Sequence, residues 1–191
     1  MSIIYFWRKM RIGVFCSASD NLADSYYEQT ATLGRWIGSN GHSILYGGTA
    51  QGLMECIAKS VKEAGGDTVG VLPKFMYDNG LASEMADEII LAKDLTERKN
   101  LLMAKADIFL ALPGGFGTLD EVFHVVASSQ LGYHNKRVIL YSMNGFYEHI
   151  KLQMERAFEE RFTPAEYRNK LVVVDSLAIC TLELCSCLNK I

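Results

Sequence analysis

The sequence has few prolines, few cysteines and no strong excess of charge of either sign. Only three prolines occur in 191 residues, and no proline-rich linker divides the chain, so we expect a single domain. The net charge of −3 argues against a nucleic-acid polymer as a partner, because such a partner favours a basic surface. A small phosphorylated ligand needs only local positive charge and is compatible with this composition.

The cysteines are odd in number and scattered, which excludes a disulfide framework. Cys185 and Cys187 have no second pair and no nearby histidine to complete a zinc site. No clustered ligand set occurs elsewhere, and we expect no metal. The pattern favours reduced thiols in a cytoplasmic protein, with Cys16 and Cys56 in the core.

Residues 1–10 are apolar but too short to span a membrane. They lack a basic segment before the apolar part and a small-residue cleavage site, so we expect no signal peptide. Because Met10 would itself make a good beginning, we interpret residues 1–10 as an extension that is a candidate for fraying, and residues 11–191 as the domain. No other segment has a long uncharged apolar run, and we expect no membrane partner.

Short apolar runs alternate with longer amphipathic runs along the whole chain, which predicts strands and helices in turn. The expected strands are short and mostly apolar throughout, as in a sheet covered on both faces. They are Ile12–Cys16, Ser43–Tyr46, Thr68–Val71, Glu88–Leu91, Ile108–Leu112, Arg137–Tyr141 and Leu171–Val174. The expected helices are Leu22–Asn40, Leu53–Ala64, Leu95–Ala106, Leu119–Leu131, Phe146–Arg161 and Ser176–Leu188.

This alternation predicts an α/β fold: one Rossmann-like, doubly wound domain with a mainly parallel sheet of about seven strands flanked by helices. Ligands of such sheets bind beyond the carboxyl ends of the strands. Candidate site residues are therefore sought just after the strands.

Two of these loops are weak candidates. The loop after the first strand contains Ser17 but lacks the dinucleotide-binding motif G-x-G-x-x-G. The absence of this motif argues against an NAD-dependent enzyme. The Ser17 hydroxyl either contacts a ligand or belongs to a tight turn. Gly48 and Met54, after the second strand, lie in a glycine-rich loop that would let a ligand approach the backbone. Such a loop is as often only a turn.

The loop after the fifth strand gives the strongest signal. Gly114, Gly115 and Gly117 lie within four residues, followed by Thr118 and a helical segment. Backbone N–H groups at a helix start favour an anion such as phosphate, and the Thr118 hydroxyl adds a donor. The loop lacks the Gly-Lys-Ser/Thr ending of a Walker motif.

Two further positions bring charge to this loop. Glu121 is either a helix-capping residue, in a Thr118-x-x-Glu121 capping box, or a catalytic carboxylate beside the bound phosphate. Arg98 and Lys99 stand near the start of a helix, where cations are unfavourable for the dipole, which hints at a function, although a solvated face is the commoner explanation for such a run. Lys99 is either a weaker, point-charge contact to the ligand or simply exposed. Arg98 could hold a phosphate or carboxylate with two hydrogen bonds.

Together, Arg98-Lys99 and the motif Pro113 to Glu121 resemble the paired signature of the LOG (Lonely Guy) family, formerly described as lysine decarboxylases. Tyr46-Gly47-Gly48 and Gly145-Phe146-Tyr147 are among the further matching segments. Thr49 and Glu55 depart from the family by replacing common glycines, which bears on the shape of the base pocket.

The resemblance implies hydrolysis of the N-glycosidic bond of an adenosine-type nucleoside 5′-monophosphate, without a cofactor, in a homodimer or a higher homo-oligomer. It implies that Arg98 and Glu121 are catalytic and that the three loop glycines and Thr118 hold the phosphate. Glu84 matches an acidic position that contacts ribose or base, though more weakly.

Two other functions fit the same residues. A non-catalytic nucleotide carrier or sensor would use the same glycine loop, because binding and hydrolysis share it. A pyridoxal phosphate-dependent lysine decarboxylase would use a lysine such as Lys99. The chain is short for such an enzyme and carries no independent signature of that cofactor.

Overall fold

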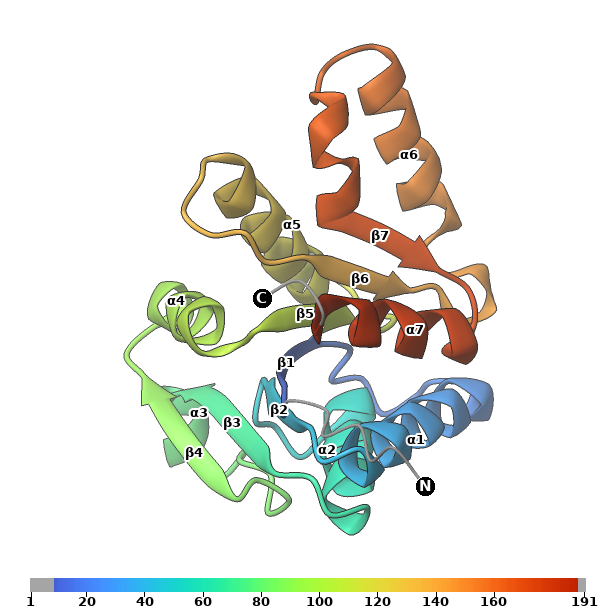
Figure 1. Cartoon of the computed structure of the whole chain (residues 1–191). Helices are drawn as coiled ribbons and strands as arrows, with labels where there is room; N and C mark the ends of the chain where they lie inside the picture. Colours follow the sequence, from blue (N-terminus) through green and yellow to red (C-terminus); the bar gives the residue numbers. More distant parts are fainter. Residues whose placement is uncertain (1–8, 189–191) are drawn as a thin grey trace, which may run out of the picture.

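The computed structural model describes residues 9–188, and most of the expected N-terminal extension, residues 1–8, lies outside the described residues. Met10, at the end of that extension, is buried. Seven strands form one parallel sheet in the order β4-β3-β2-β1-β5-β6-β7 (Figure 1). The strands are β1 Arg11–Phe15, β2 Ser43–Tyr46, β3 Thr68–Pro73, β4 Glu88–Ala92, β5 Ile108–Ala111, β6 Val138–Tyr141 and β7 Leu171–Val174.

Helices connect the strands, as the alternating pattern predicts. They are α1 Asp24–Ser39, α2 Gly52–Glu63, α3 Lys74–Asp78, α4 Leu95–Lys105, α5 Phe116–Gln130, α6 Glu148–Glu159 and α7 Leu177–Leu188, with 3-10 helices η1 Met143–Gly145 and η2 Ala165–Lys170. The α/β fold with a parallel sheet is confirmed. The short helix α3 is absent from the prediction, because five residues carry too little periodicity to reveal it.

The start of α5 corrects one prediction. The helix begins at Phe116 with Gly115 as its N-cap, three residues before the expected start at Leu119. Thr118 and Glu121 therefore lie inside the helix, and the capping-box interpretation of these two residues is wrong. The Glu121 side chain is free of a capping role and takes another partner.

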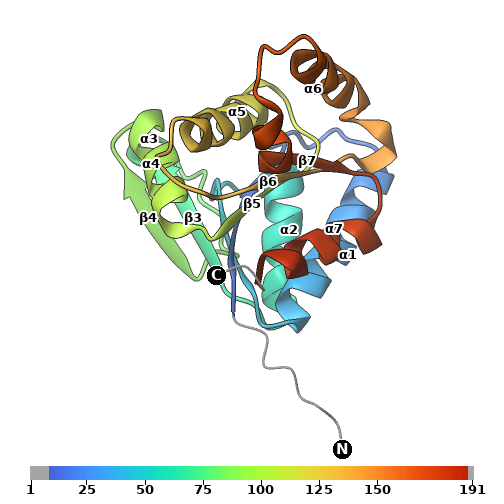
Figure 2. The same ribbon diagram turned by 45° about the horizontal axis from the view of Figure 1, so that its top comes forward.

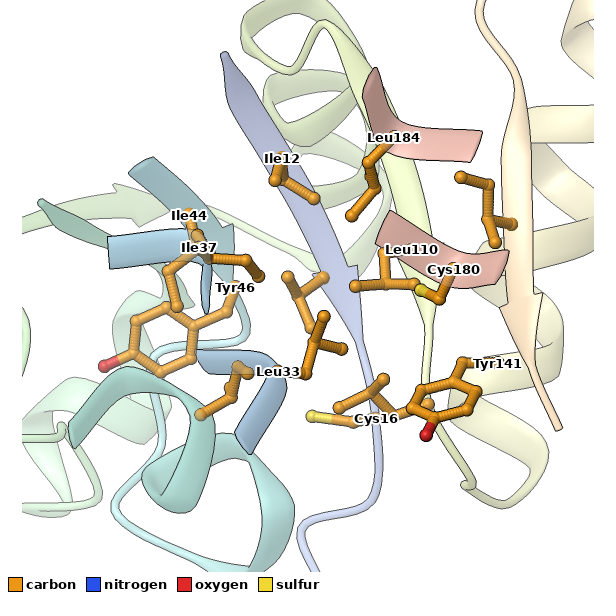
Figure 3. Packing of buried hydrophobic residues seen from close by; sticks show 14 of the residues in the cluster. Ile12, Cys16, Leu33, Ile37, Ile44, Tyr46, Leu110, Tyr141, Cys180 and Leu184 are labelled. Carbon is orange, nitrogen blue, oxygen red and sulfur yellow. The ribbon is translucent and has the colours of Figure 1, made fainter. Parts of the chain in front are cut away.

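The side chains of the central strands alternate between two cores. On one face, Ile12 and Val14 of β1 and Leu110 of β5 pack under helices α1, α2 and α7 (Figures 2 and 3). On the other face, Phe15 and Phe109 stack with ring centroids 5.3 Å apart under α4 and α5. Because both faces are covered, the strands are apolar throughout.

The sheet reverses its winding at β1. The chain proceeds outward from β1 through β2, β3 and β4, and then returns to place β5 on the other side of β1. The carboxyl ends of β1 and β5 therefore diverge into loops on opposite sides of the sheet, which leaves a crevice between them. Ser17 and the loop at Pro113 follow these two strands.

Helices α1 and α2 approach closely at glycines. A Cβ atom added at Gly38 would lie 2.7 Å from the Ala64 Cβ and would overlap the Val61 carbonyl oxygen. Backbone cannot move away as easily as a side-chain end. The close contact therefore requires glycine at this helical position.

We predict that Gly38→Ala lowers the free energy of unfolding by roughly 2 kcal/mol, because the added methyl group forces the two helices apart. Helix propensity alone predicts the opposite sign, a gain of about 1 kcal/mol. Urea unfolding measures the difference, with Ser39→Ala at the neighbouring exposed position as the control. A stabilised Gly38→Ala variant would contradict the packing argument.

Candidate active site

A cavity of about 360 Å³ lies at the crevice between the carboxyl ends of β1 and β5. Its size is within the range of pockets that bind small molecules. Loops after β1, β2 and β5 and the first turns of α4 and α5 enclose it. The lining residues are Cys16, Ser17, Ala18, Gly47, Thr49, Met54, Met76, Leu95, Arg98, Lys99, Gly115, Gly117, Thr118, Asp120 and Glu121.

Backbone hydrogen bonds at Ser17 join the three loops that follow the strands. The Ser17 N–H donates to the Pro113 carbonyl oxygen at 3.1 Å, and the Ser17 carbonyl accepts from the Leu53 N–H at 3.0 Å. The Asp20 carboxylate accepts from the Gly52 N–H at 2.8 Å, which ties down the start of α2. These contacts fix the loops relative to one another and therefore set the width of the cavity.

The glycine loop presents open backbone to the cavity. Gly115 and Gly117 line it, and a Cβ atom added at either would meet nothing within 4 Å. Gly114 lies behind the loop, where a Cβ atom would overlap the Thr118 Oγ1 and lie 3.1 Å from the Ser17 nitrogen. The first N–H groups of α5 have no acceptor within the helix and are available to an anion.

Arg98 and Glu121 form an ion pair in the wall of the cavity. The Arg98 Nη1 donates to the Glu121 Oε1 at 2.5 Å, and its Nε donates to the Val71 carbonyl oxygen at 2.9 Å. The two side chains are only 12% and 6% exposed. Arg98 therefore joins α4, β3 and α5, and it presents a fixed charge to the cavity.

A second ion pair runs beside the first. The Lys99 Nζ donates to both carboxylate oxygens of Asp120, at 3.0 and 2.9 Å. Consecutive residues of α4 are thus paired with consecutive residues of α5. The Asp120 side chain is 62% exposed, so this second pair stands at the mouth of the cavity.

Burial changes the protonation of two groups in the wall. The pKa of the Glu121 carboxyl is raised, chiefly because burial penalises the anion, although the Arg98 guanidinium opposes this effect. Burial also raises the pKa of the Cys16 thiol far above its ordinary value, and the neighbouring Glu121 carboxylate adds to the shift. The thiol is therefore neutral, and Glu121 ionises at a higher pH than an exposed glutamate.

Most of the predicted site residues meet at this cavity. Arg98, Lys99, Glu121, Ser17, Met54, Gly115, Gly117 and Thr118 all line it, and Gly114 supports the loop from behind. Gly48 is not among the lining residues. It has φ of +77° and packs against Gly70, while its neighbour Gly47 faces the cavity.

Glu84 is exposed and does not line the cavity. Its neighbour Ser83 donates a hydrogen bond to the Glu55 carboxylate, so Glu55 joins α2 to this loop. Sequence reasoning missed Asp120 as a site residue, although it stands beside Glu121 in the motif. It also missed Met76 and Leu95, because apolar side chains carry no chemical signal of a site.

The cysteines differ in part from the prediction. Cys16 and Cys180 are buried, whereas Cys56 is only half-buried. In the described part of the chain, no group of three or more His, Cys, Asp or Glu side chains is placed to hold a metal ion. None of the helices within residues 9–188 is long and apolar enough to cross a membrane.

Comparison with known proteins agrees with the site. The family model described as "Possible lysine decarboxylase" matches residues 54–182. The chain is 33% identical over 165 residues to cytokinin riboside 5′-monophosphate phosphoribohydrolase LOG5 of Arabidopsis thaliana, covering 86% of this chain and 72% of the relative. It is 34% identical over 162 residues to LOG3 of the same plant, covering 85% and 75%.

Solved structures share the fold. The molybdenum cofactor carrier protein of Chlamydomonas reinhardtii superposes with a TM-score of 0.75 at 24% identity, covering 96% of this chain and 100% of that chain. This likeness concerns the architecture alone. The family match and the sequence relatives, together with the paired signature at the cavity, show that the chain belongs to the LOG family.

Proposed function

We propose that the protein hydrolyses the N-glycosidic bond of an adenosine-type nucleoside 5′-monophosphate, such as AMP or a cytokinin riboside monophosphate, releasing the free base and ribose 5-phosphate. The observation that carries this proposal is the buried Arg98–Glu121 pair, whose carboxylate lies within one helical turn of an open glycine loop. Phosphate on the loop would leave the ribose beside the Glu121 carboxylate. The names of the sequence relatives support the same reaction class.

The two walls of the cavity suit the two ends of such a nucleotide. The loop and Arg98 form the polar wall, while Met54, Met76 and Leu95 supply apolar surface for a flat base. Thr49 borders this apolar region, and its hydroxyl lies 3.2 Å from the Met54 sulfur. Gly48 and Glu84 are proposed as weaker contributors that act from outside the lining.

The chemistry follows from the charge that develops during cleavage. Breaking the glycosidic bond builds positive charge on the ribose ring, which a nearby carboxylate stabilises. Ionised Glu121 can also orient or deprotonate the attacking water. Arg98 holds that carboxylate in place, and phosphate binding far from the reacting bond positions the ribose.

We predict that Glu121→Gln lowers base release from AMP and from isopentenyladenosine monophosphate by roughly 100-fold or more, because the amide cannot stabilise the ribose cation or accept a proton. Chromatography of the free base measures the rate. Glu159→Gln, on the exposed face of α6, is the control and should keep full activity. Unchanged base release by Glu121→Gln would remove Glu121 from the mechanism.

A carrier or sensor remains the second candidate, favoured by the glycine loop alone. The same assay separates the two functions. Tight AMP binding by the unaltered protein without release of adenine would support the carrier. Carbon dioxide release from lysine with added pyridoxal phosphate would support the decarboxylase instead.

The Lys99–Asp120 ion pair should affect the pH dependence of the proposed hydrolysis. Glu121 acts as the anion, so activity appears as pH rises through its pKa, which burial raises and Asp120 raises further. The charged or titratable groups around it are Arg98 and Lys99 of α4, Asp120 of α5 and the Cys16 thiol after β1. Removing the negative charge at Asp120 makes ionisation of Glu121 easier.

We predict that Asp120→Asn moves the acidic limb of the kcat/KM profile to lower pH, because loss of the neighbouring negative charge lowers the pKa of Glu121. The profile of the Glu159→Gln control should coincide with that of the unaltered protein. A shift of the Asp120→Asn profile to higher pH would contradict the assigned direction.

We also propose that the protein forms a homodimer or a higher homo-oligomer, in line with the resemblance to its family. Helix α5 exposes Phe116 and Phe123, seven residues apart and therefore on one side of the helix, at 94% and 37%. Leu131, just beyond the helix, is 74% exposed. Such apolar surface suits contact with a second copy.

Light scattering should give a mass of at least two 21.3 kDa chains. Phe123→Asp should shift the protein toward single chains, because a charge opposes burial of this surface. Leu152→Asp on α6, where the side chain is also exposed, serves as the control. A single-chain mass for the unaltered protein would overturn the proposed assembly.

A further inference from the structure

The segment Gly145-Phe146-Tyr147 belongs to the family resemblance, yet none of its residues lines the cavity. Tyr147 nevertheless points toward the site from the start of α6. Its ring is wholly buried, and its hydroxyl donates to the Leu112 carbonyl oxygen at 2.6 Å. Leu112 is the residue immediately before Pro113, where the glycine loop begins.

The turn before Tyr147 is built to aim this side chain inward. Gly145 has φ of +75°, a conformation that other residues adopt only with strain. The Tyr147 N–H donates to the Ser142 Oγ at 2.8 Å, and the Ser142 N–H donates to the Val174 carbonyl at 2.7 Å. The turn is therefore anchored to β7 before the chain enters α6.

The Tyr147 hydrogen bond is the last of three contacts that hold the Leu112–Pro113 peptide, with which the glycine loop begins. The Leu112 N–H donates to the Phe15 carbonyl at 2.9 Å, and the Pro113 carbonyl accepts from the Ser17 N–H at 3.1 Å. Within residues 9–188, the Leu112 carbonyl, which lies between these two contacts, accepts a hydrogen bond from Tyr147 alone. Because a peptide unit is planar, a fixed carbonyl fixes the direction in which the chain continues.

We propose that Tyr147 is a positioning residue for phosphate binding: its buried hydroxyl orients the Leu112–Pro113 peptide and thereby aims the backbone N–H groups of the glycine loop into the cavity. This inference rests on the proposed function, in which that loop holds the phosphate. Tyr147 itself touches no substrate. Its effect is confined to ligands that carry a phosphate.

The test is Tyr147→Phe, which keeps the buried ring and removes only the hydroxyl. Calorimetry measures the Kd for two probes, ribose 5-phosphate and adenosine, so that binding is scored without hydrolysis. We expect the affinity for ribose 5-phosphate to fall about tenfold, since the loop loses its fixed direction. The affinity for adenosine should stay unchanged.

Tyr167→Phe is the matched control. Its hydroxyl also donates to a backbone carbonyl, that of Gln130 at 3.2 Å, at the end of α5 far from the loop. Both affinities should be unchanged in this variant. Ser142→Ala, which removes the acceptor of the Tyr147 N–H, provides a second variant with a smaller loss of the same kind should Tyr147→Phe fail to fold.

Equal losses for both probes, or an unaltered affinity for ribose 5-phosphate in folded Tyr147→Phe and Ser142→Ala, would overturn the positioning role. Failure of the proposed function has a different signature. In that case the unaltered protein itself would either bind AMP without releasing adenine or bind neither ribose 5-phosphate nor AMP.

Discussion

The ion pair between Arg98 and Glu121 is the interaction on which the rest of the site depends. A buried pair of charges is a poor source of stability, because the cost of leaving water offsets much of the attraction. Removing one partner would nevertheless leave the other charge stranded, at a cost of about 3–5 kcal/mol. The pair therefore keeps each member in place, and with it the geometry of α4 against α5.

The remaining contacts arrange a binding surface around this pair. Ser17 joins the loops after β1, β2 and β5 through backbone hydrogen bonds, and Tyr147 holds the last of these loops from beneath. Glycine at positions 115 and 117 leaves the loop backbone open on the cavity side. The site thus combines a rigid support with an open surface, as binding of an anion by backbone groups requires.

The parts of the fold that follow from local pattern could be predicted from the sequence. Strands β2 and β7 match their predicted limits, because β2 ends at the pair Gly47-Gly48 and β7 is bounded by the charged residues Lys170 and Asp175. The meeting of Arg98 with Glu121 could be expected only from the resemblance, since 23 positions separate them and no periodicity joins them. The early start of α5 was missed because glycines at 115 and 117 are typical of loops, whereas here Gly117 lies in the first turn of a helix.

Residue type alone did not identify two further residues, Asp120 and Tyr147, that contribute to the arrangement of the site. Asp120 is an ordinary surface carboxylate in the sequence, and only the fold places it against Lys99 beside Glu121. Tyr147 lies 26 positions beyond Glu121, and its hydrogen-bond partners Leu112 and Ser142 are not cavity-lining residues. Both contacts depend on the order of the strands in the sheet, because that order decides which helices and loops lie side by side.

The neutral Cys16 thiol in the cavity wall has a consequence for oxidative conditions. Oxidants attack the thiolate, and a thiol whose pKa lies far above its ordinary value exposes almost none of it. The half-buried thiols of Cys56 and Cys185 meet solvent more readily than Cys16. Peroxide would therefore oxidise Cys56 and Cys185 before Cys16, and the thiol in the cavity wall would outlast the thiols nearer the surface.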